Sequence, residues 1–119
     1  MSRLYAVLAW LLAALAALHM ATTWRLASAT SFTKVWFFGA GIAMAQAAAL
    51  NLLHRRYGHG AVGLRWVTRA SNLFMLGVSI VAGLVTGASL GELVIMLGLL
   101  AALLLLSFTR GSAAGSGSV

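Results

Sequence analysis

The sequence contains no cysteine and only one acidic residue, Glu92, in 119 residues. Without cysteine there is no disulfide framework, no thiolate metal site and no thiol chemistry. A single carboxylate cannot supply paired catalytic acids, and the motifs of hydrolases, kinases and nucleotide-binding proteins are also missing. We therefore expect neither catalysis nor a cofactor, and the sequence by itself does not define a reaction.

Charge is scarce as well, because 8% of the residues are charged and 62% are hydrophobic, with a mean hydropathy of +1.01. In soluble domains about a quarter of the residues are charged. The apolar runs predict crossings at about residues 4–24, 35–54, 62–86 and 89–108, each near the roughly 20 residues that span a bilayer. The sequence therefore predicts an all-α membrane protein in which residues 1–110 form one antiparallel, up-down-up-down bundle of four transmembrane helices.

Two further expectations concern location and the end of the chain. A multi-pass integral membrane protein of this composition is expected in a membrane such as the bacterial cytoplasmic (inner) membrane. Residues 111–119 are rich in glycine and serine, which predicts a flexible tail or a cloning scar rather than part of the fold.

Eight Lys and Arg residues give a net charge of +7. In a soluble protein this would suggest nucleic acid, but here the basic residues flank apolar runs, so anionic lipid headgroups are the expected counterions and nucleic acid is not. The two sides of the predicted bundle are unequal in positive charge, with Arg3, Arg55, Arg56, Arg65, Arg69 and Arg110 on one side and Arg25 and Lys34 on the other. The positive-inside rule then predicts that both termini are cytosolic.

The basic stretch between the two halves of the chain, residues 51–69, is predicted to be a cytosolic hinge. Its arginines, Arg55, Arg56, Arg65 and Arg69, are expected to bind lipid headgroups and to determine topology. Gly58 is expected to end the second helix in the left-handed conformation. Either Ser31 or Thr33 is expected to cap the start of that helix.

Small residues recur at every fourth position in the first three predicted helices, which favours close helix packing. The three sets are Ala9, Ala13, Ala17 and Ala21; Gly39, Ala43 and Ala47; and Ser79, Gly83 and Gly87. The turn between the third and fourth helices is short, so these two helices are expected to be antiparallel neighbours. Ser89 and Glu92 have the spacing of a capping box at the start of the fourth helix.

Polar residues inside a bilayer are costly, so the few present here form the candidate polar site: His19, Gln46, Asn51, Asn72 and Glu92. Asn51 and Asn72 are predicted at similar depth on consecutive helices, where they form either an interhelical hydrogen bond or a ligand site. Arg69 lies three residues before Asn72 and is expected to bind a lipid phosphate or a helix C-terminus.

Glu92 and His19 each allow two interpretations. Glu92 is either a helix cap or a carrier of protons or cations. His19 either hydrogen-bonds to Thr22, Thr23 or a loop carbonyl, or joins Glu92 in an outer-face cluster, with Arg25 and Lys34, that binds an anion or relays a proton. Haem ligation by two histidines is not expected, because His19 and His54 are predicted near opposite membrane faces, roughly 20 Å apart at 1.5 Å per residue.

Two classes of function remain. The first is a small polytopic membrane protein without catalysis that acts as a subunit, an assembly factor or a lipid-interacting scaffold, in a homo-oligomer or a larger membrane complex. The second is an oligomeric small-solute or ion permease that uses Gln46 and the His19/Glu92 cluster. A bundle of four helices has little room for an aqueous path, so the permease requires partners.

Overall fold

A computed structural model describes residues 2–26 and 28–109. These residues form four α-helices, α1 (Ser2–Thr22), α2 (Ser31–Tyr57), α3 (Val62–Thr86) and α4 (Leu90–Leu106), with one turn of 3-10 helix, η1 (Thr23–Arg25), after α1. The prediction of an all-helical chain with four helices is confirmed. Arg110 and the predicted tail at 111–119 lie outside the described residues.

Three helices, α1 with η1, α2 and α3, are long and apolar enough to cross a membrane. These helices indicate a membrane protein. α4 has 17 residues, which at 1.5 Å per residue span about 26 Å. The fourth predicted crossing, 89–108, is therefore a shorter helix than expected. α2 is longer than predicted, with 27 residues that start before 35 and end after 54.

The ends of the helices differ from prediction in two places. Thr30, rather than Ser31 or Thr33, caps α2, and its Oγ1 accepts a hydrogen bond from the Thr33 N–H at 3.2 Å. Gly58 has a right-handed φ of −62° and not the predicted left-handed conformation. The left-handed glycine is Gly87, with φ 65°, directly after α3.

The predicted capping box at the start of α4 is confirmed. The Ser89 Oγ accepts a hydrogen bond from the Glu92 N–H, and the Glu92 carboxylate accepts one from the Ser89 N–H at 3.0 Å. These bonds satisfy backbone donors that the first turn of a helix leaves unpaired.

Helix packing follows alternating steps of three and four residues. The buried face of α1 consists of Tyr5, Ala9, Leu12 and Ala16, and it packs with Met44, Ala47 and Ala48 of α2 and with Leu100 and Leu103 of α4. The prediction that small residues at strict intervals of four pack between helices is only partly correct. Ala9, Ala47 and Gly83 are buried, but Ala17, Ala21 and Gly39 are exposed. A step of four residues turns about 400°, so each step moves the stripe some 40° around the helix and away from its partner.

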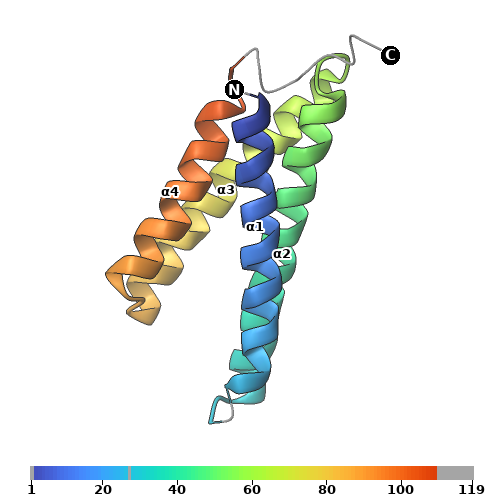
Figure 1. Cartoon of the computed structure of the whole chain (residues 1–119). Helices are drawn as coiled ribbons and strands as arrows, with labels where there is room; N and C mark the ends of the chain where they lie inside the picture. The colour runs from blue at the N-terminus through green and yellow to red at the C-terminus, as the bar shows by residue number, and fades with distance from the viewer. Residues whose placement is uncertain (1, 27, 110–119) are drawn as a thin grey trace.

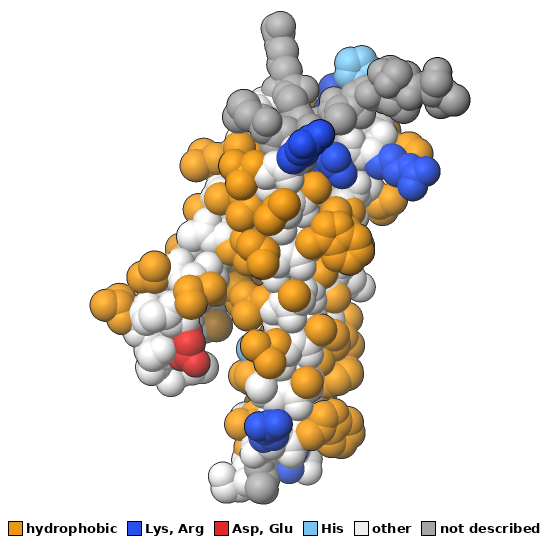
Figure 2. Space-filling view, in the orientation of Figure 1, with side chains coloured by type: hydrophobic (Ala, Val, Ile, Leu, Met, Phe, Trp, Pro, Cys, Tyr) orange, Lys and Arg blue, Asp and Glu red, His pale blue; other side chains and the backbone are white. Residues whose placement is uncertain are grey.

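The helices form two antiparallel hairpins, α1 with α2 and α3 with α4 (Figure 1). The hairpins lie together at the end where the chain begins and diverge toward the other end, and the α3/α4 hairpin is the shorter one. Lys and Arg side chains gather at the two ends of the molecule, and hydrophobic side chains cover the surface between them (Figure 2). This distribution is typical of a protein that lies across a bilayer.

Candidate functional site

A buried polar cluster joins α1, α2 and α3 at the end where the hairpins meet. Its members, Tyr5, Asn51, His54 and Asn72, are at most 1% exposed, and we call them the hinge-end cluster. The Tyr5 hydroxyl donates to Asn51 Oδ1 at 2.5 Å and lies 3.0 Å from His54 Nδ1. Because the hydroxyl has one proton, the contact with His54 requires the tautomer in which Nδ1 carries the hydrogen.

The two asparagines of the cluster form a reciprocal amide pair. Asn51 Nδ2 donates to Asn72 Oδ1 at 2.7 Å, and Asn72 Nδ2 donates to Asn51 Oδ1 at 2.8 Å. Asn51 Nδ2 also donates to the Ala47 carbonyl at 2.7 Å. With the bond from Tyr5, both donors and both acceptor positions of the Asn51 amide are used. The interhelical hydrogen bond predicted from sequence is confirmed.

Arg69 extends the polar contacts from α3 to α4. Its Nε and Nη2 donate to the Ser107 carbonyl, just beyond the end of α4, at 3.3 and 3.0 Å. Its guanidinium carbon also lies 4.3 Å from the centre of the Phe108 ring and 5.5 Å from that of Trp66. A cation at a helix C-terminus interacts favourably with the helix dipole. The predicted contact of Arg69 with a helix C-terminus is confirmed.

Sequence reasoning missed three members of this region, Tyr5, His54 and Thr68. Thr68 is fully buried and its hydroxyl donates to the carbonyls of Leu64, at 2.8 Å, and Leu50, at 3.3 Å. A signal for His54 was present, because it lies three residues after Asn51 and therefore on the same face of α2. Tyr5 lies two residues after Arg3 at the predicted membrane interface, so an interface anchor was the ordinary expectation and a buried partner of Asn51 was not.

His19 does not form the predicted bonds to its neighbouring threonines. The hydroxyls of Thr22 and Thr23 donate instead to the His19 backbone carbonyl, at 2.9 and 3.4 Å. The imidazole stacks on Phe37 of α2 with ring centres 3.7 Å apart. Its Nε2 is buried and has no hydrogen-bond partner among the described residues.

Glu92 and His19 do not form a joint cluster. The carboxylate is the only acidic side chain of the chain, and it bonds to Ser89 of its own capping box. Because α4 begins at Leu90, Glu92 lies at the tip of the α3/α4 hairpin, which diverges from the far end of the α1/α2 hairpin (Figure 1). Gln46 is exposed on α2 and has no hydrogen bond within the described part of the chain.

The remaining hinge arginines lie at the same end as the hinge-end cluster. Arg56 is exposed and its guanidinium lies 5.4 Å from the centre of the Tyr57 ring. Arg55 and Arg65 are half-buried, and the Arg55 Nε has no partner among residues 2–26 and 28–109. Their role at lipid headgroups stays a prediction.

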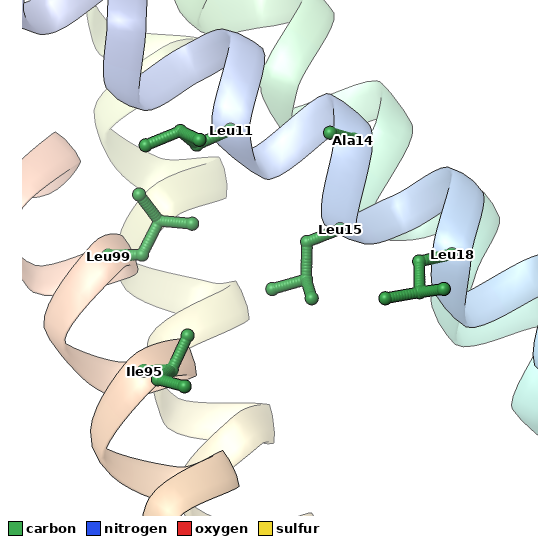
Figure 3. Close-up of a pocket in the computed structure, with 6 residues that line it drawn as sticks. All are labelled: Leu11, Ala14, Leu15, Leu18, Ile95 and Leu99. Carbon is green, nitrogen blue, oxygen red and sulfur yellow. The ribbon is translucent and has the colours of Figure 1, made fainter.

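An apolar groove separates the hairpins away from the hinge end. It has a volume of about 320 Å³ and is lined by Leu11, Ala14, Leu15 and Leu18 of α1 and by Ile95 and Leu99 of α4. Figure 3 shows the side chains of the two helices facing each other across the open space. The lining has no charged or hydrogen-bonding side chain, so the groove is suited to hydrocarbon and not to a polar substrate.

His19 and His54 are not arranged to share a haem. His54 packs against Tyr5, near the start of α1, whereas His19 packs against Phe37. The fourteen residues from Tyr5 to His19 correspond to about 21 Å along a helix. Among the described residues there is also no group of three or more His, Cys, Asp or Glu side chains that could hold a metal ion.

The comparisons with known proteins identify no relatives. No protein-family model, no curated protein and no solved structure matches the chain.

Proposed function

We propose that the protein is a multi-pass membrane scaffold without catalysis of its own, acting as a subunit or assembly factor in a larger membrane complex. One observation carries the proposal. Large hydrophobic side chains remain exposed on all four helices, whereas most buried polar side chains bond to one another or to backbone carbonyls. A protein of this kind offers helix surfaces to lipids and other proteins, and the groove between its two hairpins is lined by apolar side chains alone.

The proposal includes a location and an orientation. We place both termini and the 51–69 hinge in the cytosol and the chain in the bacterial cytoplasmic membrane, with α4 as a short fourth crossing. The support is the excess of arginine at the hinge end, which the positive-inside rule assigns to the cytosol. Arg55, Arg56 and Arg65 would then face anionic lipid headgroups.

Native mass spectrometry of protein extracted from membranes with a mild detergent tests the scaffold function. We expect a stoichiometric complex, either of several copies or with another membrane protein, together with bound anionic lipid. A monomer that carries neither protein nor lipid would overturn the proposal.

An oligomeric permease is the second candidate, and the exposed amide of Gln46 near the middle of α2 favours it. Such a side chain could line a path formed between copies, with His19 nearer the outer end. Flux into liposomes distinguishes the two functions. A permease loses flux when Gln46 or His19 is changed to Ala, whereas a scaffold shows no flux above that of empty liposomes.

A further inference from the structure

The side of α2 that faces away from α1 has a regular pattern of exposed residues. Val35, Gly39, Ile42, Gln46, Ala49 and Leu53 are all exposed, and we call them the α2 outer seam. They are separated by steps of four and three residues in alternation, which places them on one face of α2, as in the seam of a coiled coil. The face that packs inside the protein, with Gly41, Met44, Ala48 and Asn51, is already occupied.

Gln46 lies in the middle of this seam, and its amide makes no hydrogen bond in the described part of the chain. Exposed to hydrocarbon, an unpaired amide is costly, and polar side chains within a bilayer usually bond across helices. The seam is otherwise apolar from Val35 to Leu53 and carries no charge. The space beside Gly39 is open, because a Cβ at this position would meet no atom within 4 Å. A second helix could therefore approach α2 closely there.

We propose that a second copy of this chain packs on the α2 outer seam, with Gln46 of each copy hydrogen-bonded to Gln46 of the other. Identical chains adopt the same orientation in a membrane, so the two amides lie at the same depth. An amide both donates and accepts, and two glutamines can therefore satisfy each other. A different partner would have to supply a polar group at that one depth, whereas a second copy supplies it by symmetry.

This inference rests on the proposed scaffold function and names one partner and one surface for it. The absence of native cysteine permits a direct test with single-cysteine variants. Ile42→Cys, Ala49→Cys and Leu53→Cys lie on the seam and keep Gln46, and Val78→Cys, at a position 46% exposed on α3, is the matched control. Oxidation in native membranes should link the three seam variants into dimers and leave the control monomeric. Equal linkage at position 78 would overturn the inference.

Association is then measured by energy transfer between labelled copies at increasing dilution in liposomes. Gln46→Leu should weaken association roughly tenfold, since it removes the paired interhelical hydrogen bonds, and Gln46→Asn, which keeps an amide, should retain most of it. Gln46 is exposed, so neither change should unfold the monomer. If Gln46→Leu associates as strongly as the unaltered protein, the proposed interface at the α2 outer seam is wrong.

The two proposals can fail separately. If native mass spectrometry shows a complex with another protein but the seam variants do not cross-link, the scaffold function is supported and the proposed packing of two copies on the seam is wrong. If the protein is monomeric, unaccompanied and unlinked, both are wrong.

Discussion

The two ends of the bundle are held together by different forces. At the hinge end, hydrogen bonds of the hinge-end cluster connect α1, α2 and α3, and Arg69 connects α3 to α4. At the other end the hairpins diverge around an apolar groove. Inside a bilayer apolar contacts between helices gain little from leaving lipid, whereas hydrogen bonds have no water to replace them. The polar end is therefore expected to fix the fold, and the apolar end is free to accept other molecules.

The largest effect is expected at the centre of the hinge-end cluster. Asn51→Leu removes the acceptor of the Tyr5 hydroxyl and both bonds to the buried Asn72 amide and should lower the free energy of unfolding by about 2–4 kcal/mol. Unfolding in detergent micelles titrated with SDS measures it. Ala40→Leu, at an exposed position of the same helix outside the α2 outer seam, is the control and should leave the free energy of unfolding unaltered. Equal losses of free energy of unfolding in both variants would show that the hydrogen bonds of the hinge-end cluster do not fix the fold.

Two alanines of α1 test the other end. Ala16 is fully buried against α2, whereas Ala14 lines the groove. Ala16→Leu should destabilise by about 1–3 kcal/mol because the site is full, and Ala14→Leu should be neutral or slightly stabilising because it fills open space. The same SDS titration compares them. Comparable destabilisation by Ala14→Leu would show that the groove is closed in the folded protein.

Arg69 tests the bond between α3 and α4. Lysine keeps the positive charge but loses the guanidinium fork and the contact with the rings of Trp66 and Phe108. Arg69→Lys should therefore reduce stability by about 1 kcal/mol. Arg56→Lys is the matched control, because Arg56 is exposed and the same change should have no measurable effect on unfolding. If the two substitutions change stability equally, positive charge alone accounts for the contribution of Arg69 to stability.

Local patterns in the sequence predicted the helices, the bond between Asn51 and Asn72, and the capping box of Ser89 and Glu92. Each of these depends on hydrophobic length, on depth or on a spacing within one turn. What joins Tyr5 to Asn51 is a contact across 46 residues, and it depends on how α1 rotates against α2. No local pattern contains that rotation, which is also why the small residues at intervals of four were assigned to the wrong face in part.

The separation of Glu92 from His19 has a similar cause. The sequence predicts that both lie toward the outer face, but it contains no information on the divergence of the hairpins. α4 starts at Leu90 and has 17 residues, so Glu92 lies at the tip of the shorter hairpin. Hydropathy predicts the depth of a side chain in the membrane, but two side chains at similar depth need not be neighbours.

The smallest effect, confined to the tip of the α3/α4 hairpin, is expected at Glu92. Glutamine can accept the Ser89 N–H bond in a capping box as glutamate does, so Glu92→Gln should leave the structure unchanged. Glu92→Ala should speed amide hydrogen exchange at the start of α4 and leave the hinge end unaffected. Exchange measured by mass spectrometry on the two variants checks this. A carrier of protons or cations requires the carboxylate itself, so loss of liposome flux in Glu92→Gln, with exchange unchanged, would show that Glu92 serves transport in addition to capping α4. Retention of the cap in Gln and its loss in Ala would instead assign Glu92 to the structure of the apolar end.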